Sequence, residues 1–350
     1  MKSIRFTRVC CNANSLRRNP EVKRVSLSIK IYLLAFIGGF LASASSLPFL
    51  RAWCVRVGLV DDPGHRKIHH TPIPLAGGLA VLTGLLVPLL GSVLLLNLNV
   101  LDPNAAHLLN HGWSRRASEL LTILFGGLGM GALGWADDKQ ELSPALKFAG
   151  QFLIAALTAA AGIRITLFVP SLAFSYFVTI LWILTVTNAF NFMDNMNGLC
   201  AGLGVISAAA IAILAARHDQ YLVALIAVLV CGALAGFLPF NYPRASAFLG
   251  DTGSHLAGYL LAILAILPHF YSAKHPRPLA VLSPLLILAV PLLDLAWVVF
   301  IRWRLGQPFY VGDNNHLSHR LVRRGFSKPV AVALIWLLAT SAVGLAFLIG

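Results

Sequence analysis

Residues 198–240 read GLCAGLGVISAAAIAILAARHDQYLVALIAVLVCGALAGFLPF, and a short polar segment, RHDQ at 217–220, separates two long apolar stretches. Crossing the hydrocarbon core of a bilayer, about 30 Å thick, takes about 20 helical residues. Each apolar stretch is long enough for one crossing. This part of the sequence therefore predicts two membrane-spanning helices joined by a tight polar loop.

The composition of the whole chain agrees with that prediction. Its 350 residues are 58% hydrophobic and 11% charged, and the mean hydropathy is +0.78. Soluble globular domains carry about 25% charged residues. A β-barrel would need regular alternation of apolar and polar residues, which this sequence does not show. We therefore predict an all-α polytopic membrane protein.

Similar apolar stretches recur along the chain and predict about ten transmembrane helices. Their expected positions are 30–50, 75–97, 117–136, 145–162, 169–188, 198–216, 221–240, 253–270, 279–301 and 329–349. We expect residues 30–350 to form a single transmembrane catalytic domain. The polar, basic segment 1–29 is expected to be a disordered tail.

The distribution of cations predicts which side of the membrane is cytoplasmic. If every span crosses once, one side holds the loops 51–74, 137–144, 189–197, 241–252 and 302–328. These loops contain twelve Lys and Arg residues, whereas the loops of the other side contain six. The positive-inside rule then makes the first side cytoplasmic. Seven further cations in the N-terminal tail lie on the opposite side in this arrangement and disagree with the rule.

The net charge of +14 does not indicate a nucleic-acid partner. The basic residues lie in loops beside apolar spans, so topology, anionic lipid and substrate phosphate explain them better. The bilayer is therefore the expected partner, and nucleic acid is not.

Acidic residues gather on the predicted cytoplasmic side. Nine of the thirteen fall there: Asp61, Asp62, Asp137, Asp138, Glu141, Asp194, Asp251, Asp294 and Asp313. A membrane protein that concentrates its few carboxylates in this way is expected to build a metal and phosphate site at the bilayer surface. Asp294 lies inside a predicted span, where an acid faces protein or water and function is the default interpretation.

Asp137 and Asp138 follow directly on the apolar residues of a predicted span. Negative charge at the C-terminal end of a helix is unfavourable by about 0.3–1 kcal/mol for each group. Two adjacent carboxylates also repel each other. Chemistry with Mg²⁺ or phosphate therefore explains the pair better than a solvated surface position does.

Two further polar segments lie on the same side. Asp251, in FLGDTGS at 248–254, precedes a span and either caps that helix or supplies another oxygen ligand beside the aspartate pair. The segment NAFNFMDNMNG at 188–198 holds four Asn and one Asp. These amides either bond between helices or line a polar pocket for a base or sugar, and their position beside the acids favours the pocket.

Basic and histidine-containing loops complete the set. Lys67 lies in a proline-rich loop and either contacts a phosphate or only sets topology. His316 and His319 have i,i+3 spacing, with Arg320 next to them. A zinc site is the alternative there. Hydrogen bonding to phosphate is favoured, because only these two histidines supply nitrogen ligands.

Five of these segments together resemble the polyprenyl-phosphate N-acetylhexosamine-1-phosphate transferases. In chain order they are DDPGHRKIHHTPIPLAGG, GWADDKQ, NAFNFMDNMNG, FNYPRASAFLGDTGS and DNNHLSHRL. The resemblance covers nearly the whole chain after residue 50. The family includes the bacterial initiators of O-antigen, enterobacterial common antigen and wall teichoic acid, and the phospho-MurNAc-pentapeptide transferase of peptidoglycan synthesis.

The resemblance implies roles for individual residues. Asp137, Asp138, Asp194, His316 and His319 are implied to be catalytic. Lys67, Asn191, Asn197, Phe248 and Arg320 are implied to bind substrate, with Phe248 stacking on uracil. Asp251 and Asp137 are implied to hold Mg²⁺, or Mn²⁺ as the alternative.

The resemblance also implies a reaction at the bacterial inner membrane, with the site facing the cytoplasm. A HexNAc-1-phosphate, GlcNAc-1-phosphate first among them, passes from a UDP-sugar to undecaprenyl phosphate, and UMP leaves. That is the first membrane step of a cell-envelope polysaccharide such as lipopolysaccharide. Family membership is compatible with a homodimer.

One departure keeps alternatives open. The family usually has Asp at the position of Asn197, which slightly weakens the case for full activity and motivates an inactive or scaffolding homologue as an alternative. A transporter is the other non-enzyme alternative, and only Asp294 favours it. Within the family, a UDP-MurNAc-pentapeptide donor is the alternative, but DNNHLSH at 313–319 is more similar to the HexNAc branch, because the peptidoglycan enzyme has three consecutive His there.

Overall fold

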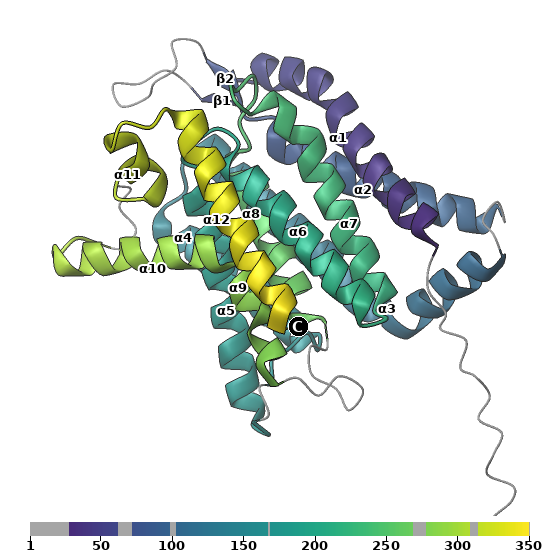
Figure 1. The fold of residues 1–350 in the computed structure, drawn as a ribbon. Coiled ribbons are helices and arrows are strands. Elements are labelled where there is room, and N and C mark those ends of the chain that lie inside the picture. Colours follow the sequence, from purple (N-terminus) through teal and green to yellow (C-terminus); the bar gives the residue numbers. More distant parts are fainter. Residues whose placement is uncertain are drawn as a thin grey trace, which may run out of the picture.

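The computed structural model describes residues 28–61, 72–98, 103–166, 169–268, 278–308 and 314–349. The described residues are almost entirely helical (Figure 1). In chain order the elements are α1 (Ile29–Arg56), β1 (Val60–Asp61), β2 (Ile73–Pro74), α2 (Gly77–Asn97), α3 (Pro103–Gln140), α4 (Pro144–Ala160), α5 (Leu172–Met193), α6 (Leu199–Arg217), α7 (Tyr221–Phe237), η1 (Leu238–Phe240), α8 (Gly250–Ile266), η2 (Pro278–Leu282), α9 (Ser283–Ile287), α10 (Ala289–Arg304), α11 (Leu317–Arg323) and α12 (Lys328–Ile349). The two short strands pair antiparallel.

Seven helices among the described residues are long and apolar enough to cross a membrane. They coincide with seven of the predicted spans, so the chain is an all-α polytopic membrane protein. The predicted spans 145–162 and 253–270 correspond to α4 and α8, each of 17 residues. At 1.5 Å per residue, 17 residues extend about 26 Å, somewhat less than the hydrocarbon core. The count of ten crossings stays a prediction.

The predicted span 279–301 is a bent pair of helices in the structure. Leu279–Ile287 and Ala289–Arg304 meet at 71° and count as one further span if the pair crosses together. Pro291 explains the break. It has no N–H to bond the carbonyl of Ile287, and its ring clashes with that carbonyl. Figure 1 shows α10 extending away from the bundle as a result.

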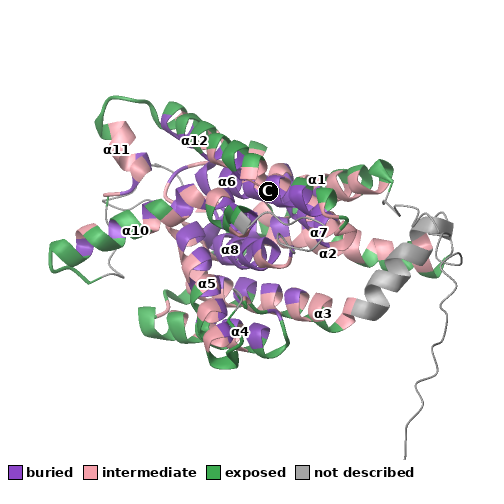
Figure 2. Ribbon diagram, turned by 60° about the horizontal axis from the view of Figure 1, so that its bottom comes forward, coloured by how far each residue is buried: buried purple, intermediate pink, exposed green. Residues whose placement is uncertain are grey.

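Helix α8 is the central element of the bundle. It packs against α2, α3, α5 and α6, and its residues from Thr252 to Ala265 are buried. Figure 2 shows α8 as buried, whereas much of α12 and the far end of α10 are exposed. The exposed side chains of the outer helices include large apolar ones such as Leu90 and Leu338. A lipid environment accounts for such faces, because hydrocarbon rather than water contacts them.

Helices α1 and α7 approach each other closely because α7 presents glycine to α1. A Cβ atom on Gly232 would lie 2.3 Å from the carbonyl oxygen of Phe36, and one on Gly236 would lie 2.3 Å from that of Phe40. The two glycines are four residues apart and share one helix face. Small residues at this spacing let two membrane helices bring their backbones together.

Candidate active site

The site begins where the C-terminal end of α3 meets the N-terminal end of α8. Asp138 accepts hydrogen bonds from the backbone N–H of Asp251 (2.7 Å) and of Thr252 (2.9 Å), and from the Thr252 hydroxyl (2.6 Å). Asp138 therefore caps α8 from another helix. A negative charge that is unfavourable at the end of α3 becomes favourable at the start of α8.

Gly250 makes this capping geometry possible. Its φ is +70°, a conformation that costs glycine little. A Cβ atom there would lie 2.8 Å from Oδ2 of Asp138. The glycine in the FLGDTGS segment thus lets the carboxylate approach the amides at the start of α8.

Lys147 joins two of the predicted site acids. Its ammonium lies 2.6 Å from Oδ2 of Asp137 and is also in contact with Oδ2 of Asp251. The three side chains come from α3, α4 and α8, and all are largely buried. Charge-assisted bonds of this kind are stronger than neutral ones. Asp137 also accepts the backbone N–H of Leu142 at 2.8 Å, which fixes its orientation.

Asp251 does not cap its own helix. Its Oδ1 accepts the side-chain amide of Asn191 at 2.7 Å, and the same amide lies 3.0 Å from the Ser254 hydroxyl. Its Oδ2 is used by Lys147. The capping alternative for Asp251 was wrong, since Asp138 performs that function and frees the Asp251 carboxylate to face α4 and α5.

Asp194, at the C-terminal end of α5, is electrostatically part of the same cluster. Removal from solvent raises the pKa of its carboxyl to about 8, helped by the charges of Asp251 and Asp138 and opposed by the N–H of Gly250. Burial also acts to raise the pKa of Asp251, but hydrogen bonding to Asp137 and the charge of Lys147 outweigh it and hold that pKa well below its ordinary value. Neighbouring carboxyls with pKa values pushed apart are typical of active sites.

The asparagine-rich segment ties elements together. Asn188 bonds Gln151 of α4 at 2.7 Å, and Asn195 accepts the Ser318 hydroxyl at 2.7 Å. Asn197 lies 3.4 Å from the carbonyl of Pro243. These contacts are the interhelical bonding that was the alternative interpretation of the segment. Its predicted role as a pocket for base or sugar stays a prediction.

The segment that contains His316, His319 and Arg320 lies against α5 and α10. The ring of His316 meets the ring of Phe192 edge-on, with centroids 5.7 Å apart, and the ring of His319 lies 6.2 Å from that of His316. Arg320 stacks on Trp297 of α10, with its guanidinium 4.8 Å from the ring. Desolvation lowers the pKa of His319, and the nearby cationic groups lower it further.

Lys67, like Asp62 and Asp313, lies outside the described residues. Phe248 is half-buried, and its backbone bonds Gly77 at 2.9 Å and Pro74 at 3.0 Å. Its predicted stacking on uracil stays a prediction.

Sequence reasoning passed over Lys147 and Thr252 as site residues. Lys147 lies in the first turn of α4, where a cation opposes the helix dipole. That unfavourable position is the same kind of signal that identified Asp137 and Asp138. Thr252 gave no comparable signal, because a threonine at a helix start is ordinary.

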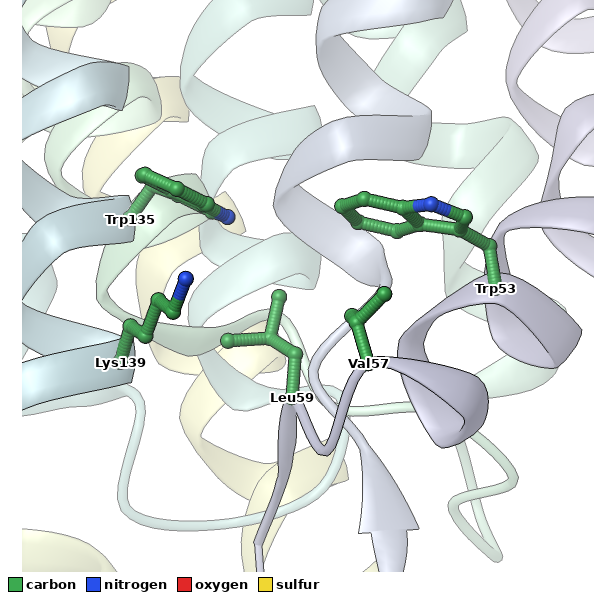
Figure 3. A pocket seen from close by; sticks show the side chains of 5 residues that line it. All are labelled: Trp53, Val57, Leu59, Trp135 and Lys139. Carbon is green, nitrogen blue, oxygen red and sulfur yellow. The ribbon is translucent and has the colours of Figure 1, made fainter.

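A small pocket lies beside the acid cluster (Figure 3). Trp53 and Val57 come from the end of α1, Leu59 from the segment that follows, and Trp135 and Lys139 from the end of α3. The Lys139 ammonium lies 5.2 Å from the centre of the Trp135 ring. Tryptophan and lysine at the ends of spans are typical of the membrane–water interface. The position of the acid cluster at the bilayer surface stays a prediction.

Fold and site together define a polytopic membrane protein with a charged site where several helices end. Residues 120–269 match the family described as glycosyl transferase family 4. The chain is 31% identical over 314 residues to the probable undecaprenyl-phosphate N-acetylglucosaminyl 1-phosphate transferase of Bacillus subtilis, which covers 87% of this chain and 81% of that protein.

Other relatives have similar names. Decaprenyl-phosphate N-acetylglucosaminephosphotransferase of Mycobacterium tuberculosis is 33% identical over 316 residues, covering 82% of this chain and 75% of the relative. The undecaprenyl-phosphate alpha-N-acetylglucosaminyl 1-phosphate transferase of Escherichia coli K12 is 28% identical over 320 residues, covering 86% of this chain and 79% of the relative. The chain belongs to the polyprenyl-phosphate N-acetylhexosamine-1-phosphate transferase family, which confirms the resemblance noted in its sequence.

Proposed function

We propose that this protein transfers GlcNAc-1-phosphate from UDP-GlcNAc to undecaprenyl phosphate. An oxygen of the lipid phosphate forms a bond to the sugar-linked phosphorus, and the bond from that phosphorus to the bridging oxygen breaks. The products are undecaprenyl-diphospho-GlcNAc and UMP. The names of its relatives support the lipid acceptor and the transferred GlcNAc-1-phosphate group, and the acid cluster supports phosphoryl chemistry.

The observation that carries the proposal is the contact of Lys147 with both Asp137 and Asp251. In this reaction two anionic substrates must approach, so positioning and charge neutralisation are the main tasks. Lys147 supplies a fixed positive charge between two helix ends. His316 is a further group suited to phosphate oxygens, because its ring N–H groups can donate hydrogen bonds.

The donor set also fits Mg²⁺, with Mn²⁺ as the alternative. No group of three or more His, Cys, Asp or Glu side chains in the described part of the chain is arranged to hold a metal. Mg²⁺, however, is commonly bound by one or two carboxylates and substrate phosphates. Asp251 and Asp137 already share one cation and would hold the ion. When bound, the ion supplies charge neutralisation at the diphosphate.

The contacts divide the work between the two aspartates at the end of α3. Asp138 uses both oxygens as acceptors in capping α8, so we assign it a positioning role. Asp137 faces Lys147 and lies nearer the chemistry. A phosphomonoester has a second pKa of about 6 and is mostly ionised at pH 7. The lipid phosphate therefore needs little help from a base, and Asp137 orients Lys147 and the ion.

We place the site at the cytoplasmic face of the bacterial inner membrane. The lipid chain then stays in hydrocarbon while the nucleotide sugar arrives from solution. The transporter alternative loses its one supporting residue, because the carboxylate of Asp294 is engaged by His316 and by the backbone of Leu317.

The test is UMP release by the purified protein in detergent with undecaprenyl phosphate and MgCl₂. UDP-GlcNAc, UDP-GalNAc and UDP-MurNAc-pentapeptide are supplied separately, with EDTA and Asp137→Asn as negative controls. Release with UDP-GlcNAc, lost in both controls, is the expected result. If the protein is folded and releases no UMP with any of the three donors, the enzyme proposal is rejected in favour of a scaffold or transporter.

A further inference from the structure

Asp294 and His316 form a buried pair, of which only His316 has a role in the transfer reaction described above. Oδ2 of Asp294 lies 2.6 Å from Nδ1 of His316, and both residues are only 5% exposed. Oδ1 of Asp294 accepts the backbone N–H of Leu317 at 2.6 Å. Both carboxylate oxygens therefore hold the residues that begin α11.

The pair lies between the bent helix and the acid cluster. Asp294 is on α10, just beyond the break, and His316 directly precedes α11. Phe192 packs edge-on against His316, and the guanidinium of Arg302 lies 5.0 Å from the centre of the Phe192 ring. Phe192 directly follows Asn191, the amide that bonds Asp251. The histidine ring is thus held from α10 and α5 together.

The hydrogen bond specifies which ring nitrogen carries a proton. A carboxylate can only accept, so Nδ1 of His316 must carry the hydrogen in this contact. Nε2 is then the nitrogen left for another partner. The hydrogen bond made by one ring nitrogen commonly fixes the role of the other in this way.

We infer that Asp294 is a positioning residue of the transfer reaction, which holds His316 in its Nδ1–H form so that Nε2 serves a substrate phosphate. The inference rests on the proposed function for the identity of that substrate. Asp294 itself touches no reacting atom. Its effect on catalysis therefore passes through His316, and this makes the inference testable by comparing variants.

The first test is a double-mutant cycle on UMP release. Asp294→Asn replaces one acceptor oxygen with a donor, so either the ring or the Leu317 N–H loses its acceptor. We expect kcat to fall about 10- to 100-fold, as for other residues that orient a reactive side chain. KM for UDP-GlcNAc should change much less, and Asp294→Glu should recover part of the loss.

In a His316→Gln background, Asp294→Asn should cause no further loss of kcat, because residues that act as a unit are not additive. Glu119→Gln, which removes an acid in the middle of α3, is the matched control and should leave kcat unchanged. Equal losses from Asp294→Asn in both backgrounds would overturn the inference and leave Asp294 a purely structural residue.

The second test does not depend on activity. The wild-type protein carrying ¹⁵N-labelled histidine is compared with its His316→Gln variant by NMR, which identifies the His316 signals. Nitrogen shifts of a neutral ring with Nδ1–H, or of a doubly protonated ring, are expected. An Nε2–H tautomer would overturn the inference even if Asp294→Asn fails to fold. Inactive wild-type protein would reject the proposed function, while this measurement would still test the pair.

Discussion

Asp137 and Asp138 are neighbours in the chain, but their carboxylates have different partners. Asp138→Ala removes the cap of α8, and loss of an N-cap costs about 1–2 kcal/mol. Asp137→Asn leaves that cap intact and removes a charge facing Lys147. We therefore expect Asp138→Ala to lower the melting temperature in detergent, and Asp137→Asn to abolish UMP release with little change in melting temperature.

The comparison is made against Glu119→Gln, whose acid is paired with Arg116 in the middle of α3 (3.1 Å). That exposed pair should contribute little to stability. If Asp138→Ala melts at the wild-type temperature, Asp138 is not the cap that the hydrogen bonds indicate.

Asp194 predicts a dependence of stability on pH. Because its pKa is raised to about 8 in the fold, the folded state keeps a proton that the unfolded state releases above its ordinary pKa of about 3.9. Stability from this group is therefore fully present below about pH 4 and declines as the pH rises through about 8.

Melting temperatures between pH 6 and pH 9 in EDTA measure this dependence, since a bound cation would favour the ionised form. Asp194→Asn cannot ionise, so it should lose less stability than the wild-type protein over that range. Parallel curves for the two proteins would show that Asp194 titrates normally.

The sequence identified most residues of the acid cluster but not their arrangement. Apolar spans placed Asp137, Asp251 and Asn191 on one side of the membrane, and the structure brings them within hydrogen-bonding distance of one another or of Lys147. Which carboxylate caps α8 depends on how α3 and α8 pack. Local sequence offers Asp251 as its own cap, whereas tertiary structure supplies Asp138.

At the scale of helices, the contact between α1 and α7 gives a sharp prediction. Gly236→Ala would place a methyl group 2.3 Å from the carbonyl oxygen of Phe40, which is backbone and cannot simply move aside. The helices must separate or shift. Overpacking typically costs about 1–3 kcal/mol, so the melting temperature in detergent should fall.

Gly344→Ala in α12 is the matched control, because a Cβ there has open space around it. That change should be neutral or stabilising by about 0.5–1 kcal/mol, since alanine favours helix over glycine. Equal effects of the two substitutions would show that helix propensity, not the α1–α7 contact, determines the result.

Helix positions were more predictable than helix shapes. Apolar length located the seven spans because a bilayer demands it. The bend between α9 and α10 was missed, although Pro291 was visible in the sequence, because apolar length alone does not show where a helix breaks. The pairing of Asp294 with His316 follows from that bend and from the placement of α11, which no local pattern encodes.

For the whole molecule, the arrangement of helix ends predicts which loops share a side of the membrane. The ends that carry Asp137, Asp194 and Asp251 meet in one cluster, and α6 leads away from it to the exposed residue Asp219. The turn before α12, with exposed Arg324, is on the side of the cluster. We therefore expect Asp219→Cys to be periplasmic and Arg324→Cys to be cytoplasmic.

A membrane-impermeant maleimide applied to intact spheroplasts should label Asp219→Cys at once and Arg324→Cys only after permeabilisation. The background carries Cys10→Ser and Cys11→Ser, and the remaining cysteines, Cys54, Cys200 and Cys231, are buried. The opposite pattern would place the acid cluster outside the cell, where a nucleotide sugar made in the cytoplasm could not reach it. Labelling of both positions in intact spheroplasts would contradict the arrangement of spans itself, because α12 and the α6–α7 loop would then share one face.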